Sequence, residues 1–175
     1  MNFSALLTAL RKISSYHHVI EVLHRSGQNH SAFTLTWGLL DAARPAVLAA
    51  LQGDWSGPIL VLSAQPERAR FLQEQVSLWA TDPAHLWYFP APDALFYDRT
   101  PWDRETIQRR VSVLSALINK DYVRPPMVFT SVWALMTLTV TPPILLMGIL
   151  VLSVGQTIRQ SELLEHLIAY AYEPV

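Results

Sequence analysis

The sequence predicts an α/β fold in which helices flank a mostly parallel β-sheet. Short apolar runs of strand length alternate with segments of helical period along most of the chain, and this alternation is typical of parallel sheets with right-handed crossovers. Residues 58–63 form a continuous apolar run, as expected of a strand that is covered on both faces. At 175 residues, the chain is long enough for one domain with a substantial core.

The composition excludes several classes of site. The chain has no cysteine, so disulfides, thiolate zinc sites and thiol catalysis are excluded, and a reducing compartment, the cytoplasm, is expected. The net charge is −1, which argues against the electropositive surface of a dedicated nucleic-acid binder. The first apolar run precedes Arg11 and Lys12 instead of following basic residues, so no secretion signal is predicted.

Two short helices are predicted at the N-terminus, over residues 3–13 and 16–26. Gly27 stands where a left-handed residue would end the second helix. The polar residues 28–31 then form a connector.

The first strand–turn–helix unit is predicted to begin at residue 33. Residues 33–37 (FTLTW) have the composition of a strand, and Gly38 follows them. A helix is expected over residues 44–51, because Pro45 suits a first helical turn.

A second unit follows the apolar run at residues 58–63. Pro66 opens a helix that is expected to end before residue 81, and another strand is predicted over residues 86–89. The helix has an inner apolar side and a solvent side. Its inner side holds Leu72, Val76 and Trp79, and its solvent side holds Glu67, Arg68, Arg70 and Glu74.

The stretch from residue 87 to residue 118 organises the rest of the chain. Pro90 and Pro92 end the strand, because each fixes its own φ and restricts the residue before it. After an aromatic loop, Asp103 is a good N-cap for a helix that lies on the sheet. The predicted buried stripe of this helix consists of Ile107, Val111, Leu114 and Ile118.

The C-terminal part is predicted to continue the alternation. A short strand at residues 128–130 is followed by a helix that Ser131 caps and that runs through Leu138. A further strand is expected over residues 149–154, stopped by Gly155. The last helix is expected to be capped by Ser161, with Leu164, Leu167 and Ile168 facing inward.

One charge-poor interval requires a choice between core and membrane. The 34 residues between Arg124 and Arg159 carry no formal charge. Pro142 and Pro143 divide this interval, and the second part is shorter than the roughly 20 residues that span a bilayer. A buried strand–helix–strand is therefore predicted, and a membrane segment is the alternative.

Residues 38–45 (GLLDAARP) have the spacing of a phosphate-binding loop without its residue types. Ala43 replaces the second glycine, Arg44 keeps a cation, and Pro45 offers neither a hydroxyl for Mg²⁺ nor a backbone N–H. Asp41 adds a negative charge. These residues favour a coincidental turn over a degenerate phosphate loop, and they favour an active nucleotide site least.

The loop at residues 92–103, called the organising loop, and the helix that follows it mix aromatic and basic side chains that could contact nucleic acid or a partner. The candidate contact residues are Arg99, Trp102, Arg104, Arg109 and Arg110. Nearby carboxylates neutralise most of this charge, so aromatic packing and solvated turn residues are the favoured interpretation.

No catalytic or metal site is predicted. His17, His18 and His24 lack metal-ligand spacing and are expected at the surface. The sequence has no GxSxG elbow and no GxGxxG after a strand.

Three runs resemble the N-terminal region of the bacterial transcription-repair coupling factor family, Mfd. They are FPAPDALFYDRTPWDRETIQRRVSVLSAL, VFTSVWALMTLTVTPP and LVLSVGQTIRQSELLEHLIAYAYEPV. GLLDAARPAVLAAL is similar to that family's remnant of a phosphate loop, and GPILVLSAQPERARFLQEQV to its next strand and helix. The resemblance covers residues 37–175, and the FP…YD…R pattern is its most specific part.

What the resemblance implies is a RecA-like, P-loop NTPase-like sheet similar to the first domain of the excision-repair protein UvrB. The phosphate loop would be degenerate. Residues 92–103 are too short for the long β-hairpin with which UvrB probes damaged DNA, so damage verification is expected to be absent. The implied division is an N-terminal helical segment (1–30), a UvrB-like α/β domain (31–156) and the start of a second UvrB-like domain (157–175).

The function implied is a non-catalytic scaffold in transcription-coupled nucleotide excision repair. Members of the family displace stalled RNA polymerase with a DNA translocase motor that uses ATP and Mg²⁺, and they recruit UvrA through the second domain. This segment would carry no cofactor, and its full-length protein would meet UvrA, RNA polymerase and DNA. Two alternatives remain: a nucleotide-binding enzyme domain that holds phosphate weakly through Arg44, and a small membrane protein built on residues 126–155.

Overall fold

The computed structural model describes residues 3–29, 32–92, 101–118 and 124–169. The chain divides into two compact units, Met1–Leu138 and Thr139–Val175. The divisions at residues 30 and 156 that the resemblance implies stay predictions.

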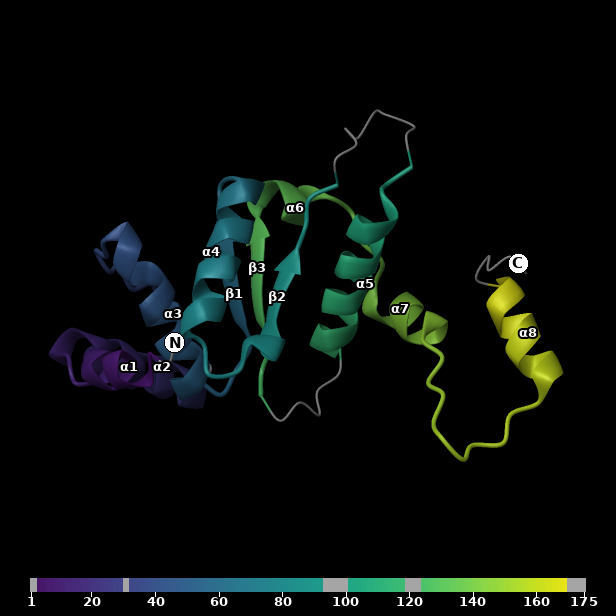
Figure 1. Cartoon of the computed structure of the whole chain (residues 1–175), viewed down its shortest axis with the longest axis horizontal. Coiled ribbons are helices and arrows are strands. Elements are labelled where there is room, and N and C mark those ends of the chain that lie inside the picture. The colour runs from purple at the N-terminus through teal and green to yellow at the C-terminus, as the bar shows by residue number, and fades with distance from the viewer. Residues whose placement is uncertain (1–2, 30–31, 93–100, 119–123, 170–175) are drawn as a thin grey trace. The chain divides into compact units, whose positions relative to one another are not determined.

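The first unit contains a three-stranded, fully parallel sheet (Figure 1). Its strands are β1 (Ile59–Ser63), β2 (Leu86–Phe89) and β3 (Met127–Ser131), in the order β1-β3-β2. In register, β3 pairs Val128 with Leu60 of β1 and with Trp87 of β2. The predicted α/β fold with a parallel sheet flanked by helices is confirmed, as are the three strands predicted at these positions.

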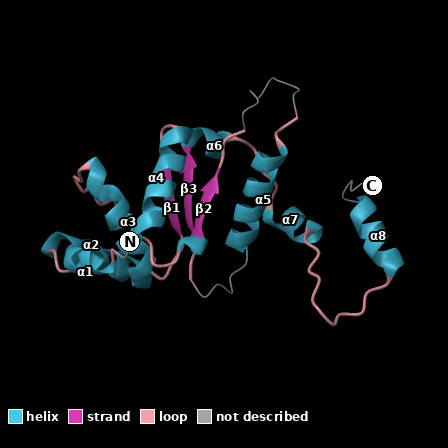
Figure 2. Ribbon diagram, in the orientation of Figure 1, coloured by secondary structure: helices cyan, strands magenta, loops and turns pink. Residues whose placement is uncertain are grey.

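One face of the sheet is covered by the last of the helices that precede β2, and the other three pack around that helix or around one another (Figure 2). They are α1 (Ser4–Arg11), α2 (Ser14–Asn29), α3 (Arg44–Asp54) and α4 (Pro66–Trp79). Helix α4 contacts all three strands, and α3 packs on α4 and α1. Fully buried Val76, Met127 and Phe129 lie at the centre of this core.

The N-terminal helices are tied to α3 by one carboxylate. Asp54 accepts hydrogen bonds from Arg11 Nε at 2.9 and 3.0 Å and from the Tyr16 hydroxyl at 2.7 Å. Tyr16 is buried, so this contact joins residues far apart in sequence inside the core. Helix α2 continues past Gly27 to Asn29, so the prediction that Gly27 ends it is wrong. An i→i−4 backbone ladder can pass through a glycine at modest cost.

The opposite face of the sheet carries α5 (Arg104–Ile118), which packs on β2, and α6 (Val132–Met136), which packs on β3. The predicted caps are confirmed: Asp103 accepts from the backbone N–H groups of Glu105 and Thr106, and Ser131 accepts from that of Ala134. Helix α6 ends at Met136, two residues before the predicted end.

The buried stripe of α5 is not the predicted one. Its buried residues are Thr106, Arg110 and Val113, whereas Ile107 and Val111 are exposed. The predicted residues share one side of the helix, but the helix is rotated by about one residue, since each residue turns it by roughly 100°. This rotation buries Arg110 against Phe89 and Trp102.

Strand β1 is covered on one face only, which corrects the prediction of a strand buried on both faces. Leu60 is 57% exposed and Leu62 is 51% exposed, while Ile59, Val61 and Ser63 are less exposed. The reason is topological. Helix α5 packs on β2, which is separated from β1 by β3.

The strand predicted at residues 33–37 does not form. The described residues 32–40 have no regular secondary structure, and Phe33 and Leu35 are exposed. Trp37 packs instead against the helices, with its ring centroid 6.4 Å from that of Tyr16. A β-prone sequence needs a neighbouring strand to pair with, and here the nearest partners are helices.

The second unit contains α7 (Pro142–Gly148) and α8 (Gln160–Ala169). No strand forms over residues 149–154. The prediction of a buried strand–helix–strand is therefore wrong for its second strand. Gly155 lies in a turn with φ of 88°, a backbone conformation that favours glycine. Helix α8 already includes Ser161, so Ser161 is not its cap, and Leu164 and Ile168 are exposed rather than inward-facing. The described residues of this unit include none that is buried.

The charge-poor interval is thus shared between β3, α6 and α7. Among the described residues, none of the helices has both the length and the apolar character needed to cross a bilayer.

Candidate functional site

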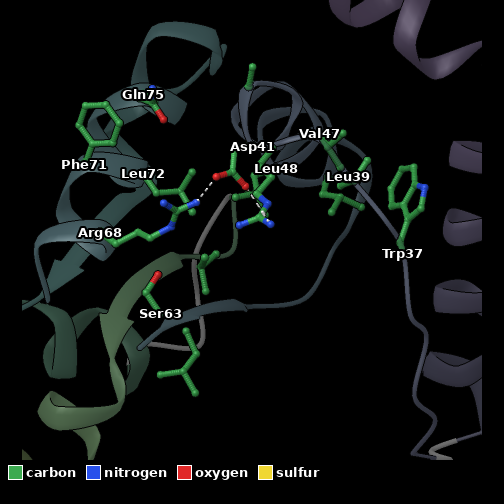
Figure 3. A pocket seen from close by; sticks show the side chains of 15 residues that line it. Trp37, Leu39, Asp41, Val47, Leu48, Ser63, Arg68, Phe71, Leu72 and Gln75 are labelled. Carbon is green, nitrogen blue, oxygen red and sulfur yellow. Dashed lines mark hydrogen bonds and ion pairs between the residues drawn. The ribbon is translucent and has the colours of Figure 1, made fainter. Parts of the chain in front are cut away.

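The candidate site is a cavity of about 530 Å³ beside the carboxyl end of β1 (Figure 3). Ser63, the last residue of β1, lines it together with the start of α3 and the first turns of α4. In parallel α/β sheets, ligands bind at this end of the strands. The lining residues are Trp37, Leu39, Asp41, Ala42, Arg44, Val47, Leu48, Leu51, Val61, Leu62, Ser63, Arg68, Phe71, Leu72 and Gln75.

One carboxylate in this cavity is shared by two arginines. Asp41 Oδ2 lies 2.7 Å from Arg68 Nη2, and Asp41 Oδ1 lies 2.9 Å from Arg44 Nη2. Figure 3 shows both contacts, one to the start of α3 and one to the first turn of α4. The hydrogen bond from Arg68, followed by the positive charges of Arg44 and Arg68, lowers the pKa of Asp41. The carboxylate therefore stays ionised at neutral pH and balances one of the two positive charges.

Residues 38–45 form a compact turn. A 3-10 turn covers Asp41–Ala43, with Ala43 N–H donating to Leu40 O at 2.9 Å. Helix α3 then starts at Arg44 with Pro45 in its first turn, as predicted, and Pro45 is buried. The described residues 32–40 before this turn form no strand. Asp41 occupies the position where an anion would meet the arginines. That the turn descends from a phosphate loop stays a prediction.

Gly38 has none of the constraints of a phosphate-loop glycine. Its φ is not positive, and a Cβ built on it would meet nothing within 4 Å. Neither the backbone conformation nor a close contact therefore requires glycine here.

A second cavity, of about 470 Å³, lies between β2, α4 and α5. It contains two of the basic side chains near the organising loop, and each has an acidic partner four residues away. Arg109 pairs with Glu105, and Arg70 pairs with Glu74 at 3.1 Å. Asp103 also lines this cavity. Carboxylates therefore offset the positive charge here, as the sequence indicates.

Arg110 serves the interior of the protein. It is 3% exposed, and its Cζ lies 4.1 Å from the ring centroid of Phe89 and 5.1 Å from that of Trp102. Its Nη1 donates to Pro90 O at 2.8 Å, while no group of the described residues accepts a hydrogen bond from its buried Nη2. Burial lowers the pKa of this guanidinium. Within the described residues, Arg110 holds the start of the organising loop onto α5 and the sheet.

The other predicted contact residues that the structure describes differ in exposure. Arg104 is exposed at the first position of α5, and Trp102 is half-buried over Arg110. Arg99 lies outside the described residues. Contact with nucleic acid or a partner stays a prediction. Of the predicted contact residues that the structure describes, Arg104 and Arg109 are the exposed basic ones that could make it.

Sequence reasoning missed Arg68. It assigned this residue to the solvent side of its helix because the flanking positions 67, 70 and 74 are also charged. The signal that could have found it is position: Arg68 lies in the first turn of α4, directly after β1. The loops that follow parallel strands gather at one edge of the sheet.

Within the described residues, no three His, Cys, Asp or Glu side chains gather as a metal site would require. His17, His18 and His24 are exposed, as expected. Asp82 and His85 form a local pair at 2.9 Å that Arg124 approaches at 3.9 Å.

No model of a known protein family matches the chain. No curated protein matches it either.

Proposed function

We propose that this chain is a non-catalytic N-terminal module of a bacterial transcription-repair coupling factor. Its place in that protein would be a UvrB-like scaffold in the cytoplasm, and its sheet would be of the RecA-like type. Two lines of argument support the proposal. The ordered sequence resemblance from residue 37 onward supports the family, and the carboxylate that fills the arginine site supports the lack of catalysis.

The observation that carries the non-catalytic part is the carboxylate between Arg44 and Arg68. Nucleotide hydrolysis in P-loop proteins needs cations on the terminal phosphates and a hydroxyl on Mg²⁺. Here both cations bind a side chain of the same protein, and buried Pro45 stands at the hydroxyl position. The scaffold of a nucleotide-binding domain thus lacks the groups that would act on a nucleotide.

A scaffold works by holding its surfaces in fixed positions, and three contacts in the first unit serve that purpose. Asp54 joins α3 to α1 and α2. Asp41 joins the turn before α3 to α4. Arg110 joins α5 to the end of β2. In the full-length protein, UvrA recruitment would use the following UvrB-like domain, and polymerase displacement would use the ATP- and Mg²⁺-dependent motor.

A chimera tests this proposal. The corresponding N-terminal region of a functional coupling factor is replaced by this chain, and a variant lacking that region is the control. We expect the chimera to retain strand-specific repair and UvrA recruitment to stalled RNA polymerase. The deletion variant loses UvrA recruitment, because it lacks both the scaffold that presents the second domain and the start of that domain. A folded chimera whose motor hydrolyses ATP but whose UvrA recruitment equals that of the deletion variant would contradict the proposal.

The alternative enzyme function is favoured by one observation, the presence of Arg44 and Arg68 at the same cavity. A nucleotide-binding enzyme would hydrolyse Mg-ATP in a manner that depends on Arg44. Purified wild-type chain and the Arg44→Ala variant separate the two proposals, because the scaffold has no activity for the substitution to remove.

A further inference from the structure

The cavity beside β1 combines a charged end with an apolar body. Its charged end is formed by Asp41, Arg44 and Arg68. Its body includes Phe71 and Leu62, which are 59% and 51% exposed. Large apolar side chains that stay exposed around a concave site are typical of binding surfaces.

The charges that line the cavity do not cancel. Two arginines face one carboxylate, and among the described lining residues Asp41 is the only acidic one. Their remaining charge of +1 favours an anion. The arginine side chains are 45% and 53% exposed, so an incoming group can reach them without unfolding the site.

Arg44 and Arg68 also have N–H donors that the contact with Asp41 does not use. Each guanidinium has five N–H donors, and Arg44 and Arg68 each use Nη2 for one oxygen of Asp41. Neither makes the two parallel hydrogen bonds that give an arginine–carboxylate pair its strength. A ligand oxyanion could therefore replace Asp41 or bind beside it.

We propose that this cavity binds a small molecule with a flat apolar body and one oxyanion head, such as an aryl phosphate monoester or an aryl carboxylate. The head contacts Arg44 and Arg68, and the body lies against Phe71 and Leu62. Asp41 competes with the head because it is held at the same two arginines by its own chain. Binding involves no bond making or breaking, so this site extends the proposed scaffold function without adding catalysis.

Phenyl phosphate is the probe that tests this site. It is titrated into the ¹⁵N-labelled full chain while the indole N–H signal of Trp37, assigned with Trp37→Phe, is followed by NMR. We expect a saturable shift of this signal in the wild type. Asp41→Asn removes the competing charge but keeps the side-chain size, and it should lower Kd by about tenfold, which corresponds to about 1.4 kcal/mol.

The matched controls lie on the same helix. Arg68→Ala should raise Kd by at least about tenfold, as expected when a charge-assisted hydrogen bond to the head is lost. Arg70→Ala, two residues further along α4, should leave Kd unchanged, because Arg70 pairs with Glu74 and does not line the cavity. Glu74→Gln is the corresponding control for Asp41→Asn.

Inorganic phosphate has the oxyanion head without the aromatic body, and benzyl alcohol has the aromatic body without the oxyanion head. Each should bind more weakly than phenyl phosphate. The proposal is overturned if Asp41→Asn shows no saturable shift, or if Arg68→Ala and Arg70→Ala give the same Kd. It is also overturned if inorganic phosphate binds as tightly as phenyl phosphate. Circular dichroism of each variant verifies that it is folded, and the Asp41→Asn result stands alone if Arg68→Ala does not fold.

Discussion

Asp41 Oδ2 and Arg68 Nη2 lie 2.7 Å apart, which joins the turn before α3 to the first turn of α4. The same carboxylate binds Arg44 through its other oxygen. The two cations that would serve a phosphate are thus held by an acidic side chain of the protein itself. The following predictions test this arrangement and the contacts that surround it.

The titration of Asp41 tests the shared carboxylate. Both arginines favour its ionised form, so its pKa in the folded protein lies below the ordinary value of 3.8. Because the folded pKa is depressed, the stabilisation is present above pH 3.8 and is lost as the pH falls through the folded pKa. Carboxyl ¹³C NMR should give a midpoint below 3.8 that rises in Arg68→Ala and does not change in Arg70→Ala. A wild-type midpoint of 3.8 or above would show that the bridge does not form in solution.

Arg110 tests whether a buried arginine holds the organising loop. Arg110→Ala should reduce the free energy of unfolding by about 2–4 kcal/mol, because it removes packing against Phe89 and Trp102 and leaves Pro90 O without its donor. Arg110→Met keeps most of the apolar stem and removes a desolvated charge, so it should cost less. Urea denaturation followed by circular dichroism measures both. If the free energy of unfolding of Arg110→Ala lies within about 0.5 kcal/mol of the wild-type value, the side chain of Arg110 is at the surface in solution and the account of it is wrong.

The buried phenol of Tyr16 should make the folded protein less stable at high pH. Burial, followed by the hydrogen bond to Asp54, raises the pKa of the phenol above its ordinary value of 10.0. The folded protein therefore keeps the proton while the unfolded chain releases it. The resulting stabilisation is complete below pH 10 and declines as the pH rises above it. Thermal unfolding between pH 9 and pH 11 should show a steeper loss in wild type than in Tyr16→Phe, and equal slopes would contradict the buried hydrogen bond.

Substitutions of Leu60 and Val128 test whether one face of β1 is exposed to solvent. These residues are paired in register and lie on the same face of the sheet, but Leu60 is 57% exposed and Val128 is 4% exposed. Val128→Gln should cost about 2–4 kcal/mol, because it buries an amide without partners. Leu60→Gln should cost less than about 1 kcal/mol. Urea denaturation compares them, and equal losses would mean that the isolated chain covers this face.

The parts of the fold that the sequence predicted are those set by local signals. Asp103 and Ser131 cap helices where their side chains predict caps, and Pro45 and Pro66 lie in first helical turns. Strands β2 and β3 lie where short apolar runs with β-prone residues indicate them. Each signal acts within a few residues and does not depend on the rest of the fold.

The errors come from contacts between distant segments. Residues 33–37 have a strand-like composition, but they contact helices, so no ladder forms. In α5, apolar periodicity favoured Ile107 and Val111, whereas the helix buries Arg110, which lies against the rings of Phe89 and Trp102. Apolar residues 149–154 predicted a buried strand, yet the described part of their unit offers no strand for pairing.

The candidate site was predicted only in part, for a related reason. The loop at residues 38–45 was identified by comparison with a known spacing, and Arg44 and Asp41 were identified within it. Their mutual contact and the approach of Arg68 depend on the crossover that brings α4 beside α3. Sequence spacing does not encode that distance.

The most direct test of the central claim is Mg-ATP hydrolysis by the purified chain, measured beside Arg44→Ala and Asp41→Asn. Because Asp41 holds both arginines and Pro45 supplies no hydroxyl, we predict that phosphate release by all three proteins equals the background without protein. Hydrolysis by the wild type that Arg44→Ala abolishes would contradict the account, since it would show that the arginine site acts on a nucleotide.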